Sequence, residues 1–228
     1  MAEAKELMKN FNHQNILKFF EVKDDDKPLF LVMERANIDL MALVEQKKSD
    51  QKLLPLSVVR DVMFDAMTAI EYIHDKGFVH MDLKPENIVI VGNVDTNSYD
   101  AKLIDFELCR RYVDDNNQMI PMIISYGTPH YGPPELWQSQ LKVHSTRYKR
   151  QPYPGDEARD IRKADMWALG HTLCVMLTGD DPFPGMEFNS RSGIDTKLKM
   201  FQLVSDRDFF LSMPAASTCS SCSRLVRV

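Results

Sequence analysis

The segment HMDLKPEN, residues 80–87, places an Asp, a Lys and an Asn directly before the apolar run Ile88–Val91. A second apolar run, Ala101–Ile104, follows a turn rich in Asn and Asp and leads into the triplet DFE, residues 105–107. The two runs predict an antiparallel hairpin. Asn87 and Asp105 would then lie at one end of the hairpin, where their oxygen atoms can converge on a cation.

Two further motifs follow in the chain. The first is GTPHYGPPE, residues 127–135, inside a segment of weak periodicity (107–135) that we expect to be a long loop. Long loops in compact domains usually carry function. The second is DMWALG, residues 165–170, which opens the apolar run Met166–Leu177. This run predicts a helix that is buried nearly all round and ends at Gly179.

The residues before the first motif predict a mixture of strands and helices. A long helix should follow Ser57 as N-cap and end before Gly77, because its apolar residues recur every three or four positions. The other expected elements are a helix over 3–12, a hairpin of strands 16–22 and 29–33, and a short helix over 40–47. Residues 195–204 could form one more helix near the other end.

The composition is that of an ordinary globular protein. The chain has 228 residues and a formal net charge of −5, with 44% hydrophobic and 27% charged residues. These values exclude a fibrous or disordered acidic protein and argue against a nucleic-acid partner, which would favour a basic excess.

The same sequence predicts a cytoplasmic protein, with the nucleus as an alternative. The first residues are polar, and no run reaches the roughly 18 apolar residues of a membrane span. The four cysteines do not form a disulfide framework. Cys219 and Cys222 have the spacing of zinc ligands, but without a second pair we interpret them as part of a Ser-rich tail.

In this order the four motifs resemble the catalytic core of eukaryotic protein kinases, whose pattern is H-R-D-L-x-x-x-N, D-F-G and A-P-E. The resemblance covers roughly residues 3–205, and Lys84 matches the serine/threonine branch. It implies an α+β, two-lobed fold made mostly of a helical large lobe, with a partial antiparallel sheet from the small lobe. The implied parts are a partial small lobe (1–33), a hinge (34–39), the large lobe with the catalytic and activation loops (40–210), and a Ser- and Cys-rich tail (211–228).

The resemblance implies ATP-dependent phosphoryl transfer to serine or threonine of protein substrates. Asp82 would orient the substrate hydroxyl, and Lys84 would steady the γ-phosphate. Asn87 and Asp105 would hold Mg²⁺. Thr128, in the substrate loop, would contact both Asp82 and Lys84.

The resemblance also implies an adenine site. Met33 would be the gatekeeper residue, and the backbone of Glu34 and Ala36 would bond the edge of the ring. Val89 would form the floor of the site, and Asp39 would reach the ribose. Plain core packing would equally require apolar residues at Met33 and Val89.

Four more residues are implied to be structural. His80 would pack beneath Phe106, in a stack that Met8 and Phe19 extend. Asp165 would hydrogen-bond the backbone of the catalytic loop, with a simple helix N-cap as the alternative. Glu135 would be the conserved acid of the A-P-E triplet, here PPE.

The chain departs from the family pattern at several positions. Met81 replaces the Arg that normally binds a phosphate on the activation loop, and Glu107 replaces the Gly of D-F-G. The first of the nine glycines is Gly77, so the glycine-rich loop over the ATP phosphates and the V-A-I-K lysine have no counterpart. We therefore expect an N-terminally truncated kinase domain.

Two interpretations stay open. The retained Asp82, Lys84, Asn87 and Asp105 favour part of an active kinase that uses ATP and Mg²⁺. Met81, Glu107 and the absent phosphate loop favour a pseudokinase that acts as a binding or scaffold module for a protein partner. A different phosphotransferase, or a purely structural helical domain, fits four ordered motifs poorly.

Overall fold

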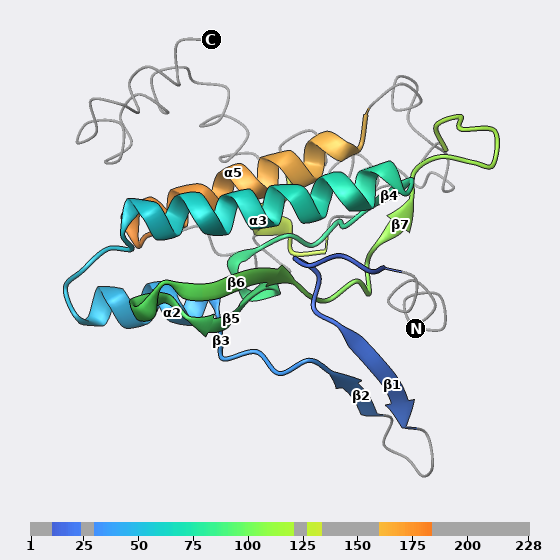
Figure 1. The fold of residues 1–228 in the computed structure, drawn as a ribbon. Helices are drawn as coiled ribbons and strands as arrows, with labels where there is room; N and C mark the ends of the chain where they lie inside the picture. Colours follow the sequence, from blue (N-terminus) through green and yellow to red (C-terminus); the bar gives the residue numbers. More distant parts are fainter. Residues whose placement is uncertain (1–10, 24–29, 121–126, 134–159, 184–228) are drawn as a thin grey trace.

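The computed structural model describes residues 11–23, 30–120, 127–133 and 160–183 (Figure 1). The predicted helix over 195–204, the tail 211–228 and Glu135 lie outside these ranges, as does all but the end of the predicted helix 3–12. Helices and antiparallel strands are mixed, in agreement with an α+β, protein kinase-like fold.

The predicted hairpin near the start of the chain is present as β1 (Phe19–Lys23) and β2 (Phe30–Met33). It projects from the rest of the described chain (Figure 1). The first strand, β1, begins three residues later than predicted. Ile16 and Leu17 are not part of it because they are buried against β6 (Ser98–Leu103). Ile16 forms a parallel bridge with Leu103, and the Leu17 amide donates to the Leu103 carbonyl at 3.0 Å.

The predicted hairpin beside the first motif is confirmed as β5 (Ile88–Asn93) and β6, with Ile88 opposite Leu103. The short 3₁₀ segment η2 (Val94–Thr96) joins the two strands. The short strand β3 (Ile38–Asp39) pairs with the other edge of β5, giving the sheet order β3-β5-β6. Because β3 runs straight into the helix α2 (Leu40–Ser49), the sheet and this helix are joined without a loop.

The long helix α3 (Leu56–Asp75) packs on β6 and alongside the helix α5 (Arg162–Thr178) (Figure 1). The prediction of Ser57 as its N-cap is wrong, since Pro55 is the N-cap and the helix starts at Leu56, two residues earlier than that prediction implies. The Pro55 carbonyl already accepts from the Val59 amide at 3.0 Å, and proline fixes a backbone angle that suits a helix start. The buried face of α3 consists of Val58, Val59, Val62, Ala66, Ala69, Ile70 and Ile73.

The helix α5 ends at Gly179 as predicted, with that glycine in the left-handed region at φ 71°. The prediction that α5 is buried nearly all round is wrong for one face of the helix. Met166 is 49% exposed, whereas Ala168 and Leu169 are buried against the core. Apolar composition therefore identified the helix but overestimated how much of it the described chain covers.

The predicted long loop contains some regular structure. Its strand β7 (Arg110–Arg111) pairs with β4 (Phe78–Val79), which follows α3. The 3₁₀ segment η3 (Pro129–Tyr131) lies in the GTPHYGPPE motif. No helix within the described ranges is long and apolar enough to cross a membrane.

Candidate active site

The loop over residues 80–84 is held in place by Asp165, a fully buried residue of α5. One carboxylate oxygen accepts from the His80 amide at 2.9 Å, and the other accepts from the Met81 amide at 3.0 Å. His74, near the end of α3, contacts the same carboxylate at 2.8 Å. A buried carboxylate is tolerated only with such partners. The N-cap alternative is wrong because Ile161 occupies the N-cap.

His80 is fully buried and is neutral. Its Nδ1 accepts from the Asp82 amide at 3.3 Å, so Nε2 carries the hydrogen and donates to the Ile104 carbonyl at 3.1 Å. Burial lowers the pKa of His80, and the nearby Asp165 carboxylate offsets this only in part. These contacts give His80 a positioning role rather than that of a base.

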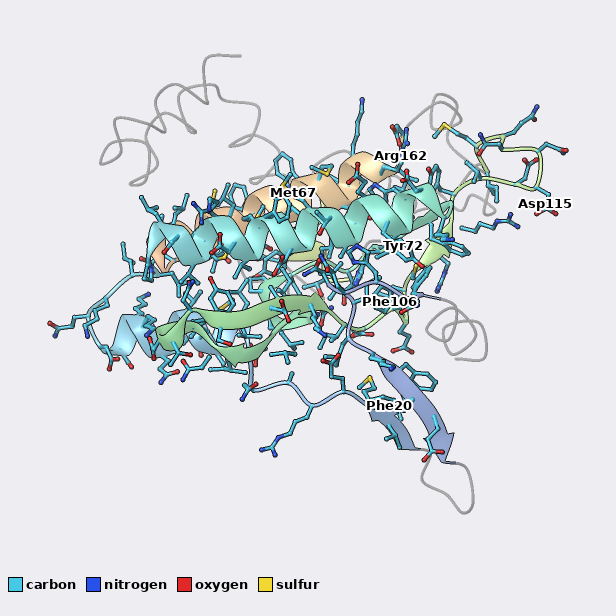
Figure 2. All side chains as sticks on the ribbon, viewed as in Figure 1. Phe20, Met67, Tyr72, Phe106, Asp115 and Arg162 are labelled. Carbon is cyan, nitrogen blue, oxygen red and sulfur yellow. The ribbon has the colours of Figure 1, made fainter. Side chains whose placement is uncertain are left out.

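Phe106, which is labelled in Figure 2, packs against His80, with the two ring centroids 5.0 Å apart. Phe11 packs edge-on against Phe106 at 5.4 Å and continues this stack. The residues predicted to extend this stack were Met8 and Phe19, not Phe11. Met8 lies outside the described residues, and Phe19 lies in the β1–β2 hairpin. Phe106 is only 1% exposed. Because this side chain is buried, it fixes the position of the backbone that follows Asp105.

Asp82 sits at the centre of a closed set of hydrogen bonds and is only 6% exposed. The Thr128 hydroxyl donates to its Oδ1 at 2.6 Å. Lys84 Nζ lies 3.2 Å from its Oδ2 and 2.8 Å from the Thr128 hydroxyl. Each of the three residues therefore contacts the other two, although 44 positions separate Lys84 from Thr128. The arrangement fixes the Asp82 carboxylate beside the Lys84 ammonium group.

Gly127 lets the loop that carries Thr128 approach Asp82 this closely. A Cβ at this position would lie 2.7 Å from Asp82 Oδ1 and 2.2 Å from a methyl carbon of Leu108. The Gly127 amide also donates to the Met81 carbonyl at 3.0 Å. The sequence contained this signal, since Gly127 opens the GTP triplet, but the residue was not singled out.

Asn87 and Asp105 come from adjacent strand ends. The Ile104 amide donates to the Asn87 carbonyl at 3.0 Å. Because Ile104 directly precedes Asp105, this bond places Asp105 close to Asn87 in the fold. Asn87 Nδ2 donates to the Asp82 carbonyl at 2.8 Å and to its carboxylate at 3.2 Å. Within the described ranges nothing donates to Asn87 Oδ1. That amide oxygen and the exposed Asp105 carboxylate are hard oxygen donors, so the residues present fit Mg²⁺.

Asp105 itself is held in the left-handed region at φ 61°. Residues other than glycine seldom adopt this conformation, and aspartate is among those that enter it most readily. Its neighbours supply the constraint, because Phe106 is buried and the Glu107 amide donates to Asp105 Oδ1 at 3.3 Å. Glu107, which replaces the family glycine, is itself exposed.

The expected hinge is tied to the sheet by an ion pair that the sequence did not reveal. Lys102 on β6 contacts both oxygens of Glu34, at 2.8 and 2.9 Å. The Glu34 amide donates to the Lys18 carbonyl at 2.8 Å. Burial alone would raise the pKa of Glu34, but the contacts with Lys102 and the Lys18 amide lower it. Among the described residues, the Glu34 carbonyl and the Ala36 amide make no hydrogen bonds.

The structure brings Asp39 and Val89 together, opposite one another in the β3–β5 pair. Val89 is buried at 6% exposure. Asp39 Oδ1 accepts from the Ala42 amide at 2.8 Å and so caps α2. Met33 lies apart from this pair, on the projecting hairpin, and is 38% exposed.

Met81, at the position of the family arginine, is 3% exposed and belongs to the hydrophobic core. It has a left-handed backbone, with φ 67°. Two hydrogen bonds hold Met81 in this conformation. Its amide donates to Asp165, and its carbonyl accepts from the Gly127 amide. The loop therefore presents no cation at this point.

Comparison with known proteins identifies the family of the sequence. Residues 1–226 match the family model described as the protein kinase domain. The serine/threonine-protein kinase RUNKEL of Arabidopsis thaliana is 33% identical over 80% of the chain and 11% of its own length. The serine/threonine-protein kinase ICK of Rattus norvegicus is 29% identical over 90% of the chain and 27% of its own length. The chain thus spans less than a third of either relative.

Proposed function

The chain belongs to the protein kinase domain family, and from that premise we propose that its site transfers the γ-phosphoryl group of ATP to serine or threonine of protein substrates. The observation that carries the proposal is the closed contact set of Asp82, Lys84 and Thr128. A carboxylate, an ammonium group and a hydroxyl from two distant segments meet in a site that is largely shielded from water. Plain folding does not require that combination.

The proposed roles follow from these contacts. Asp82 accepts the proton of the substrate hydroxyl, and the Thr128 hydroxyl and Asn87 Nδ2 hold the carboxylate in its orientation. Lys84 places a positive charge beside the transferred phosphoryl group. Asn87 and Asp105 would hold Mg²⁺, which when bound offsets negative charge on the phosphate oxygens.

On the nucleotide side, the Glu34 carbonyl and the Ala36 amide bind the edge of the adenine. Val89 supplies an apolar surface beneath it. The Lys102–Glu34 ion pair positions the hinge backbone for this purpose. Met33 and Asp39 are weaker members of the site, because the first is exposed on the hairpin and the second caps α2.

A second candidate is a pseudokinase that binds a protein partner without transferring phosphate. Glu107 favours it, since this residue adds a carboxylate two positions after Asp105, where the phosphates and their metal would approach. The buried Met81 favours it as well, because this side chain offers no charge to a phosphate on the following loop. The division into lobes at residues 33 and 39 and the cytoplasmic location remain predictions under either candidate.

The test is transfer of radiolabelled phosphate from ATP to a protein substrate such as casein, with Mg²⁺ present. Asp82→Asn should lower the rate by about 10²–10⁴-fold, the usual contribution of a positioned acid or base. The matched control is Asp115→Asn, on the loop beyond β7 and remote from the site (Figure 2). Full turnover by Asp82→Asn would refute the proposed role of Asp82. Binding of Mg²⁺ and ATP without any transfer by the parent protein would favour the second candidate.

A further inference from the structure

A second cluster of side chains begins on the same loop as Thr128 but lies outside the Asp82 site. His130 belongs to η3, His171 to α5, and Asp181 follows the end of α5. One nitrogen or oxygen atom of each residue lies within 4.8 Å of the other two. Two imidazoles and one carboxylate from three segments therefore converge, and neither the motifs nor the proposed transfer explains this.

His171 is the least satisfied member of the cluster. Its side chain is 1% exposed, and within the described part of the chain neither ring nitrogen makes a hydrogen bond. Asp181 Oδ1 lies 3.5 Å from His171 Nε2. Buried polar atoms in folded proteins are almost always paired, and an exception indicates a water or an ion at that place. A cation at Nε2 would satisfy this nitrogen.

One pair of atoms in the cluster has the spacing of neighbouring ligands on a tetrahedral metal ion. Zinc bonds of about 2.0–2.1 Å place neighbouring ligand atoms about 3.3–3.4 Å apart in a tetrahedron. The 3.5 Å between His171 Nε2 and Asp181 Oδ1 is close to that spacing. His130 Nε2 contacts the other oxygen, Asp181 Oδ2. The Phe183 amide donates to Asp181 Oδ1 at 2.7 Å and orients the carboxylate, as partners of metal ligands commonly do.

We propose that His130, His171 and Asp181 bind one Zn²⁺, with water as the fourth ligand. Imidazole nitrogens select zinc and similar transition metals over Mg²⁺ or Ca²⁺. Three protein ligands and one water form a common zinc coordination set. The bound ion would join the loop of Gly127 and Thr128 to α5. The proposal is independent of phosphoryl transfer, because a pseudokinase could carry the same site.

The test is titration of the full chain with Co²⁺, whose visible absorption reports tetrahedral coordination, followed by displacement with Zn²⁺. The parent protein for this test carries Cys219→Ser and Cys222→Ser, so that those thiols cannot bind the metal. We expect one Co²⁺ per chain and full displacement by Zn²⁺. His171→Gln and His130→Gln should each weaken Zn²⁺ binding by at least about 10-fold. Zn²⁺ should raise the Tm of the parent and leave that of His171→Gln unchanged.

The matched control is His13→Gln, because His13 is partly buried, stacks on Tyr72 and lies outside the cluster. It should bind Zn²⁺ as the parent does. If circular dichroism shows that His171→Gln is unfolded, Asp181→Asn replaces it, since that side chain is 35% exposed and is tolerated more easily. A parent without a tetrahedral Co²⁺ spectrum would overturn the proposal. So would folded cluster variants that bind Zn²⁺ as tightly as the parent.

Discussion

Asp165 should be a costly position to change, because its buried carboxylate holds the loop over residues 80–84. Its two oxygens accept separate backbone amides, from His80 and from Met81, and Oδ2 also contacts His74. All of these contacts are buried or nearly so. Asp165→Asn keeps the shape but turns one oxygen into an NH₂ group that faces a backbone N–H. Asp165→Ala leaves both amides without an acceptor.

The expected loss can be worked out from these contacts. Each buried amide left without a partner costs about 1–3 kcal/mol, and Asp165→Ala leaves two such amides and the His74 ring without their shared acceptor. Because these contributions overlap, we expect Asp165→Ala to lower the free energy of unfolding by about 3–5 kcal/mol. A typical domain has about 5–15 kcal/mol in total. Asp165→Asn should lose about half as much as Asp165→Ala.

The assay is urea unfolding followed by far-UV circular dichroism. Asp160→Asn provides the control, because Asp160 precedes the same helix and forms an exposed ion pair with Arg162. Pairs of that kind contribute about 0–1 kcal/mol. Should Asp165→Asn and Asp160→Asn lose the same small amount, the catalytic loop would not depend on the buried carboxylate, and the reasoning about His80 and Met81 would be wrong.

Three further predictions concern the site and its surroundings. Thr128→Ala should lower the transfer rate about 10-fold or more, whereas Thr128→Ser, which keeps the hydroxyl, should retain most of it; equal rates would remove Thr128 from the site. Lys102→Met should destabilise the protein at neutral pH. Since the pKa of Glu34 is lowered from 4.5 in the folded protein, this ion pair contributes above pH 4.5 and is lost as the pH falls through the folded value. Urea unfolding at several pH values should therefore show the variant and parent converging in acid, and a constant difference would contradict it. Finally, Ser125→Glu should leave the transfer rate within about twofold, because Met81 offers no charge to receive a phosphate; strong activation in the same radiolabel assay would contradict this.

The sequence predicted local structure well where one face of an element decides it. The β5–β6 hairpin and the helix α3 follow from apolar spacing alone, and both are present. The end of α5 at Gly179 follows from the need for a left-handed cap. Prediction failed where partners distant in sequence compete. Ile16 and Leu17 read as part of a strand with their neighbours, but they pair with Leu103 because that contact buries them.

In the candidate site, too, some residues could be predicted from the sequence and others could not. Asp82, Lys84, Asn87 and Asp105 could be picked out because they stand at fixed positions beside one hairpin. The Lys102–Glu34 pair could not be predicted, because it joins residues that are 68 positions apart. Lysine is also common on edge strands, so Lys102 did not stand out. The cluster of His130, His171 and Asp181 left no local pattern either, since each residue comes from a different segment.

The substitution of Met81 changes how the loop around Thr128 can be held. In the family pattern an arginine at this position receives a phosphate on the activation loop. Here the side chain is buried in the core, and only its backbone carbonyl contacts the loop, through the Gly127 amide. The other end of the loop is held by His130 at Asp181.

Two fixed ends leave Thr128 in contact with Asp82 and Lys84 without any phosphate. If the proposed Zn²⁺ occupies the His130 end, its removal should loosen Thr128 while leaving the Asp165 anchor intact. After treatment with EDTA, removal of the chelator and return to Mg²⁺, transfer or nucleotide-linked stability should be lower in the parent and unchanged in His130→Gln. A parent that is insensitive to chelation would show that the Gly127 contact alone positions the loop.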